Sequence, residues 1–83
     1  MNIQLRFFAS LRETLGATGS LHLPVAATVG QARDALIAQG APFDAALARG
    51  RALRAALNQT LCEESAVLKD GDELAFFPPV TGG

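Results

Sequence analysis

The sequence predicts an α+β fold, in which one main helix packs on one face of a small mixed sheet of about five strands. Two observations carry this prediction. Segments near both ends, 2–8 and 73–77, alternate their side chains with the two-residue period of a half-buried strand. Between them, residues 28–39 have the capping residues and the apolar stripe of an amphipathic helix.

The first predicted strand, residues 2–8, divides its side chains between two faces. Ile3, Leu5 and Phe7 fall on the face that we expect to contact the helix. Phe8 is the one apolar residue on the other, polar face. The first strand therefore carries an aromatic side chain that the core does not require.

Two short elements follow. Residues 9–15 carry leucines at helical spacing and stop at Gly16, which predicts a turn or two of helix. A second strand is expected over residues 20–24, between Gly19 and Pro24. The chain between the first two strands is too long for a two-residue hairpin.

The main helix has start and stop signals at both ends. Thr28 is the predicted N-cap, with Gln31 as its capping-box partner, and the helix runs to Gln39 and closes at Gly40. Its inward stripe is expected to comprise Val29, Ala32, Leu36 and Ile37. A shorter helix is expected within residues 41–50.

The C-terminal half returns to strands. Residues 52–57 fit a helix by their alanines and a strand by their alternation, and the turn signal that follows favours the strand. A short partner strand is expected over 60–62. The final strand, 73–77, follows the turn sequence DGD and ends at Pro78, which has no N–H for a ladder.

Two aromatic side chains are expected on the uncovered face of this sheet. If the first and last strands are neighbours, Phe8 and Phe77 form an exposed apolar patch together with Leu61. Such patches are typical of partner surfaces, and we favour this interpretation. The alternative is scattered surface hydrophobic residues, which are common.

The last six residues, PPVTGG, predict a stiff arm with a slim tip. Pro78 and Pro79 cannot rejoin a sheet, whereas Gly82 and Gly83 lack a Cβ and can enter a narrow channel. The group expected at the tip is the α-carboxylate of Gly83, a weak electrophile that needs activation before it reacts. A frayed chain end is the alternative.

Composition excludes several other classes of function. Seven basic and eight acidic side chains leave a net charge of −1, which argues against nucleic acid as a partner. One histidine and one cysteine cannot supply a structural zinc site, and Cys62 is expected to be a small buried hydrophobic residue. No apolar run approaches the ~20 residues of a membrane span, so we expect a cytoplasmic protein.

Three blocks of sequence carry a family resemblance. FFASLRETLG near the start, NQTLC in the middle and DGDELAFFPPVTGG at the end together resemble the small subunits of molybdopterin synthase. The resemblance runs from Ile3 to Gly83 and implies a ubiquitin-like β-grasp fold. It divides the chain into a β-grasp domain, 1–77, and an extended tail, 78–83, ending in Gly-Gly.

The resemblance also implies a function. Gly83 would be adenylated by an E1-like enzyme that uses ATP and converted to a thiocarboxylate, with no cofactor bound. The chain would be the non-catalytic, sulfur-carrying subunit of a heterotetramer with the large synthase subunit, and its sulfur would pass to cyclic pyranopterin monophosphate. Val80, Thr81 and Gly82 would enter the partners with Gly83, and the docking residues would be Phe8, Leu61, Phe77, Pro78 and Pro79.

Three other functions stay open. A sulfur carrier for thiamine biosynthesis would share the fold and the diglycine, although FFPPVTGG and FFASLRE favour the molybdopterin branch. A protein modifier would join Gly83 to lysines through an isopeptide bond. In a plain interaction domain, the diglycine would be incidental.

Overall fold

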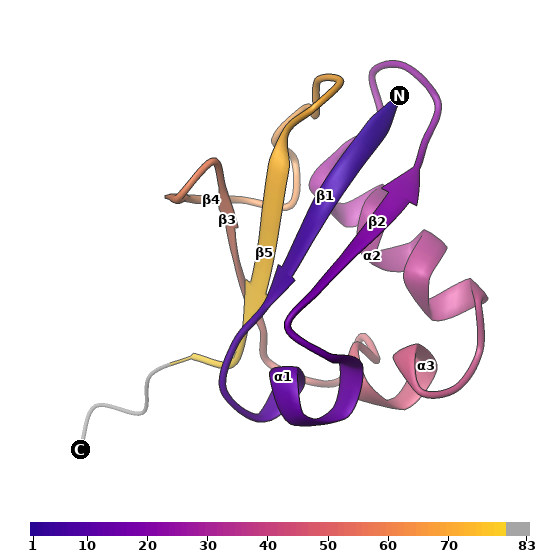
Figure 1. Ribbon diagram of the computed structural model, residues 1–83, viewed down its shortest axis with the longest axis vertical. Coiled ribbons are helices and arrows are strands. Elements are labelled where there is room, and N and C mark those ends of the chain that lie inside the picture. The colour runs from indigo at the N-terminus through magenta and orange to yellow at the C-terminus, as the bar shows by residue number, and fades with distance from the viewer. Residues whose placement is uncertain (80–83) are drawn as a thin grey trace.

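The first and last strands lie side by side and parallel in the middle of one sheet. The computed structural model describes residues 1–79, and Figure 1 shows its elements. The strands are β1 (Asn2–Phe7), β2 (Thr18–His22), β3 (Arg54–Leu57), β4 (Thr60–Cys62) and β5 (Glu73–Phe77). The helices are α1 (Ser10–Leu15), α2 (Val29–Ala38) and α3 (Phe43–Ala46). No helix formed by residues 1–79 is long and apolar enough to cross a membrane.

The five strands form a mixed sheet in the order β2-β1-β5-β3-β4. β1 runs parallel to β5, and the other neighbouring strands are antiparallel. The parallel pair sets Leu5 opposite Leu74 and Phe7 opposite Phe76. The predicted α+β fold, a mixed sheet with one main helix, is therefore confirmed. The last strand lies at the centre of the sheet, and Pro78 and Pro79 follow it outside the ladder.

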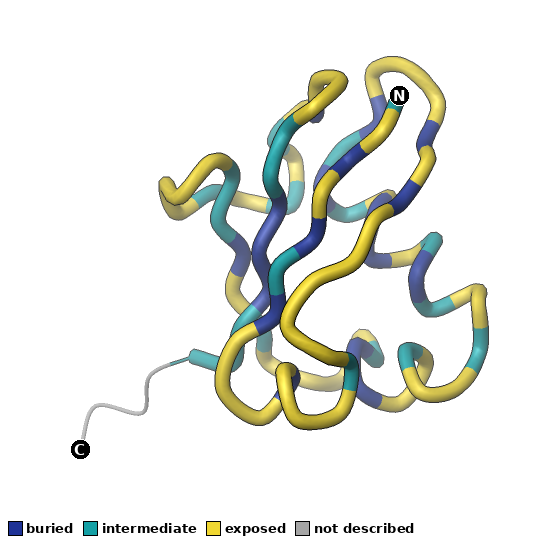
Figure 2. The backbone as a smooth tube through the Cα atoms, viewed as in Figure 1, coloured by how far each residue is buried: buried dark blue, intermediate teal, exposed yellow. Residues whose placement is uncertain are grey.

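The core fills the space between the sheet and α2. Ile3, Leu5 and Phe7 are 0–2% exposed, whereas the residues between them are more open, so the predicted faces of β1 are confirmed (Figure 2). Phe7 and Phe76 stack with their ring centroids 6.5 Å apart. The other buried apolar residues of this core are Leu11, Leu21, Leu23, Ala27, Val29, Ala32, Leu36, Ala46, Leu47, Ala55, Leu68 and Leu74.

The capping box predicted for α2 is present. The backbone N–H of Gln31 donates to Oγ1 of Thr28 at 3.2 Å, and the backbone N–H of Thr28 donates to Oε1 of Gln31 at 2.8 Å. These two bonds satisfy donors that a helix start otherwise leaves free. Gly40 follows the helix with a positive φ of 84°, where a side chain would be strained. Sequence therefore locates both ends of α2 correctly.

β1 ends at Phe7, one residue before its predicted end. The N–H of Phe8 still donates to the carbonyl of Phe76 at 3.3 Å. Ala9, however, has φ 55° and ψ −131°, and the N–H of Leu11 donates back to the carbonyl of Phe8 at 3.2 Å. This geometry is a type II′ turn, and it leads the chain out of the sheet into α1.

The bounds of two other strands are set by their partners. β2 covers Thr18–His22 rather than residues 20–24, because it pairs along β1 as far as Arg6. β3 begins at Arg54 rather than at residue 52. Arg54 lies opposite Phe77, the last residue of β5, so residues before Arg54 have no partner on that strand. Local sequence signals cannot report either limit, since each depends on the length of a neighbouring strand.

Candidate functional site

Two cavities compete as the functional site. The first has a volume of about 380 Å³ and lies beside α2 and strands β3 and β4. Five of its lining residues are charged or carry a thiol. The complete lining is Arg33, Leu53, Arg54, Ala55, Cys62, Glu63, Glu64 and Phe76. Whether it is a binding site depends on whether these groups are free to meet a ligand.

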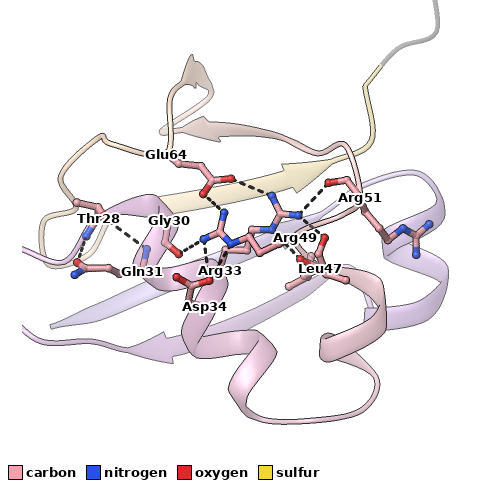
Figure 3. Close-up of polar contacts among 10 residues, drawn as sticks. Thr28, Gly30, Gln31, Arg33, Asp34, Leu47, Arg49, Arg51 and Glu64 are labelled. Carbon is pink, nitrogen blue, oxygen red and sulfur yellow. Dashed lines mark hydrogen bonds and ion pairs between the residues drawn. The ribbon is translucent and has the colours of Figure 1, made fainter.

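Arg33 is already fully engaged by the fold. This α2 residue is only 4% exposed. Its Nε donates to the carbonyl of Leu47 at 2.8 Å, and Nη2 donates to the carbonyl of Ala48 at 2.7 Å. Nη1 donates to Oε2 of Glu64 at 2.9 Å (Figure 3). A buried cation requires such partners, so Arg33 fastens the segment after α3 to α2 and has a structural role.

Arg49 and Glu64 complete this network on its exposed side. Arg49 pairs with Asp34 at 2.8 Å and with Glu64, and it donates to the carbonyl of Gly30 at 2.9 Å. Gly30 allows Glu64 to approach α2, because a Cβ there would lie 3.0 Å from Oε1 of Glu64. The hydrogen bond from Arg49 holds the pKa of the Glu64 carboxyl below its ordinary value, and the hydrogen bond from Arg33 makes a smaller contribution in the same direction. The first cavity is therefore lined by a satisfied ion network.

Cys62 is half-buried at the edge of the same cavity and packs against the core. Burial raises the pKa of its thiol, and the nearby Glu63 carboxylate raises it further. The thiolate is the reactive form of cysteine, so this environment suppresses nucleophilic and redox chemistry. Cys62 was predicted to be a small buried hydrophobic residue; it does pack against the core, but it is only half-buried.

The second cavity is an apolar groove of about 430 Å³ on the sheet face opposite α2. We call it the apolar groove. Ala56 and Ala75 face each other on β3 and β5, and their small side chains leave a hollow between larger neighbours. The complete lining is Phe8, Ala9, Ala56, Gln59, Glu73, Ala75, Phe77 and Pro78. Exposed concave apolar surfaces of this kind are typical of protein-binding sites.

The groove brings together three of the predicted docking residues. Phe8, Phe77 and Pro78 all line it, and the Phe8 side chain is 42% exposed. Leu61 does not line the groove, but it lies opposite Ala56 on the same face and is 59% exposed. Pro79 is half-buried directly after the groove residues.

The remaining predicted site residues, Val80, Thr81, Gly82 and Gly83, lie outside the described residues.

The sequence analysis did not predict the other five lining residues as site residues, nor Arg6, which borders the groove; the five are Ala9, Ala56, Gln59, Glu73 and Ala75. Ala9 holds the strained turn at one end of the groove, and alanine gives no sequence signal for a positive φ. Arg6 lies opposite Ala75 on β1 and places its guanidinium 5.6 Å from the centre of the Phe8 ring. The alternation of side chains along β1 assigned Arg6 correctly to this face. It did not predict the contacts of Arg6 with the groove residues.

Comparison with known proteins identifies the family. The model of the ThiS family matches residues 5–83. The chain belongs to the ThiS family. Two similar proteins from Escherichia coli and Haemophilus influenzae are each named molybdopterin synthase sulfur carrier subunit. They are 44% and 41% identical to this ThiS-family chain over 98% of its length and 99% of theirs. The resemblance and the sulfur-carrier function predicted from the sequence are confirmed.

Solved structures agree with this ThiS-family assignment. SAMP1 from Haloferax volcanii is 30% identical over the full length of both chains, with a TM-score of 0.78. Subunit 1 of molybdopterin-converting factor from Helicobacter pylori, solved in complex with subunit 2, is 26% identical over both full lengths, with a TM-score of 0.68. A Caldiarchaeum subterraneum ubiquitin, 20% identical over 100% of this chain and 98% of its own, shares the fold at a TM-score of 0.60. The predicted ubiquitin-like β-grasp is therefore confirmed.

Proposed function

We propose that this sulfur carrier subunit of molybdopterin synthase bears its sulfur as a thiocarboxylate at Gly83. A carboxylate oxygen of Gly83 attacks the α-phosphorus of ATP and releases pyrophosphate, which leaves an acyl adenylate. Sulfur supplied at the oxidation level of sulfide then displaces AMP, so a C–S bond forms as the C–O bond to AMP breaks. The sulfur finally passes to cyclic pyranopterin monophosphate: a C–S bond forms there in place of a C–O bond, and water then breaks the C–S bond to Gly83 and restores its carboxylate.

The position of the apolar groove is the observation that carries this proposal. β5 runs through the centre of the sheet, and its last residue, Phe77, lines the groove together with Pro78. A partner that covers the groove therefore contacts the chain at the point where residues 78–83 begin. Docking by Phe8, Leu61, Phe77, Pro78 and Pro79 would deliver Val80, Thr81, Gly82 and Gly83 to the partner's reaction centre.

The environment of Cys62 supports the terminal carboxylate as the sulfur-bearing group. A carrier could hold sulfur as a persulfide on a cysteine, but that chemistry begins from a thiolate. The pKa of the Cys62 thiol is raised by burial and by Glu63. Cys62 is also the only cysteine in the sequence. The sulfur would therefore be carried at Gly83.

Two partners would use the same groove in turn. The Helicobacter pylori relative is solved as a complex of subunits 1 and 2, which supports the large synthase subunit as one partner. We propose a heterotetramer with that subunit and a separate complex with an E1-like adenylating enzyme. Because both complexes would cover Phe8 and Phe77, they would exclude each other, and the tail would visit the two enzymes alternately.

The test is the intact mass of the protein purified gently from its own cells, followed by fragmentation. Replacement of one oxygen by sulfur, located at Gly83, would establish the thiocarboxylate. Fragmentation is necessary because oxidation at Met1 or Cys62 gives nearly the same mass shift. An unmodified terminus, even after incubation with activating enzyme, ATP and a sulfur source, would refute the proposal.

A second candidate function is protein modification. The similar structures include the small archaeal modifier protein 1 of Haloferax volcanii, which is 29% identical to this chain and motivates a search for conjugates. The same mass experiment distinguishes the two, because Gly83 would then be found in isopeptide bonds to lysines of other proteins. A thiamine-type carrier would instead show the thiocarboxylate but would fail to convert the pyranopterin with the large subunit.

A further inference from the structure

Arg6 lies at the border of the apolar groove, and its side chain has no hydrogen-bonded counterpart in the part of the chain that the structure describes. It contacts three groove residues: it lies opposite Ala75, its guanidinium stands over the ring of Phe8, and its nearest carboxylate is Glu73. The Arg6–Glu73 distance is 3.9 Å, which is too long for a hydrogen bond. Nε of Arg6 is buried and has no hydrogen-bond partner among residues 1–79.

This arrangement is unfavourable once the groove is covered. The Arg6 side chain is 43% exposed, so water can hydrate its outer nitrogens in the free protein. A partner seated on the groove would remove that water from the cation and from Glu73, and the distant Glu73 carboxylate would not replace it. A docked complex therefore requires a new acceptor for Arg6.

Arg6 is also free to take such an acceptor. Within residues 1–79, its attachments are a long ion pair with Glu73 and a cation–π contact with Phe8 at 5.6 Å, and neither holds its outer N–H groups in a hydrogen bond. Because Nε is buried, an incoming group would meet the two outer nitrogens, Nη1 and Nη2. A guanidinium presents these two donors in the geometry of a carboxylate, and the Phe8 ring supports its flat face.

We infer that the large synthase subunit places an aspartate or glutamate side chain against Arg6 when it covers the apolar groove. This inference rests on the proposed docking function and adds a chemical requirement to it. The carboxylate forms a charge-assisted, two-point contact with Arg6 beside the apolar contact with Phe8 and Phe77. Arg6 then selects among partners with otherwise similar apolar surfaces.

The experiment compares Arg6→Met, Arg6→Lys and Arg51→Met in binding to the large subunit from the same organism, measured by calorimetry over a range of salt concentrations. Arg6→Met keeps the length of the side chain and removes its charge. We expect its Kd to rise about 10-fold or more, with a weaker dependence on salt than that of the parent protein. Arg6→Lys keeps the charge but lacks the two-point geometry of the guanidinium. Its Kd should therefore lie between those of the parent protein and Arg6→Met. Arg51→Met removes an exposed charge elsewhere and should bind normally.

Two further measurements separate the possible failures. The melting temperature of Arg6→Met should match that of the parent, because Nε of Arg6 donates no hydrogen bond to any of residues 1–79. A large decrease would assign Arg6 to the fold and overturn the inference. Unchanged binding by Arg6→Met, with binding lost in Phe77→Asp, would overturn the inference while leaving the docking proposal intact. Unchanged binding by both variants would refute the docking proposal itself.

Discussion

Adjacent phenylalanines at the end of β5 give a direct test of which face of the sheet binds the partner. Phe76 points into the core, whereas Phe77 lines the apolar groove. We compare Phe76→Asp with Phe77→Asp, two changes of the same chemistry one residue apart. The first should unfold the protein, and the second should leave it folded but unable to dock.

The expected magnitudes follow from burial. Phe76 is 1% exposed and stacks on Phe7, and truncation of such a residue costs about 3–5 kcal/mol before the penalty for a buried, unpaired carboxylate is added. At about 0.05–0.15 kcal/mol per residue, the free energy of unfolding of 83 residues is only about 4–12 kcal/mol. Phe76→Asp therefore removes most or all of it.

Phe77→Asp should cost much less. Phe77 is half-buried, and the new carboxylate would stay hydrated and face Arg54 across the ladder. We expect a loss of about 1–2 kcal/mol, equivalent to a decrease of about 4–16 °C in Tm. Loss of an aromatic anchor at the centre of an interface should raise the Kd for the large subunit by about 30-fold or more.

Circular dichroism melts and calorimetric titrations of both variants measure these effects. Phe77→Asp should melt cooperatively, and Phe76→Asp should show no cooperative transition. The assignment of faces would be refuted if the two variants melted alike, or if Phe77→Asp bound the large subunit as tightly as the parent protein.

Three other predictions concern the tail, the ion network and the strained turn. Deletion of Gly82 and Gly83 should abolish sulfur transfer in a reconstituted assay, while the Kd for the large subunit changes little; a fully active truncation would refute the proposed chemistry. Since the pKa of Glu64 is lowered in the folded state, its contribution is complete above its ordinary value of 4.5 and is lost as the pH falls through the lowered pKa. Melts at decreasing pH should therefore show a shallower acid decline for Glu64→Gln, and an identical decline would contradict this. Ala9→Gly should raise Tm by about 4–8 °C, equivalent to about 1 kcal/mol, because glycine adopts the first central position of a type II′ turn without strain; a decrease in Tm would show that the turn is not strained.

Sequence patterns located most elements because their signals are local. The alternation of Ile3, Leu5 and Phe7 identified the buried face of β1, and the Thr28–Gln31 pair identified the start of α2. The order of strands was not available from these patterns, since a two-residue period defines faces and not neighbours. The central position of β5 became evident only from its pairing on both sides.

The candidate site was predictable in part for the same reason. Phe8 and Phe77 were assigned to one exposed face by alternation, and the parallel pairing of β1 and β5 brings them to one groove. Arg33 was not predicted as a buried residue, because its acceptors are backbone carbonyls that follow α3, distant in sequence. No pattern of residue types records such a contact, and the same limitation applies to Arg6 beside Glu73.

The central position of β5 also determines how the domain responds to mechanical force. In the proposed complexes, withdrawal of the tail from a partner's channel would pull β5 along its own axis while the partner holds the groove. β5 pairs with β1 on one side and with β3 on the other, and those hydrogen bonds run across the direction of pull. They are loaded together in shear, whereas an edge strand peeled from its end would lose its bonds one at a time. If the tail visits two enzymes in turn as proposed, the domain would be drawn out of one and into the other without unravelling from β5.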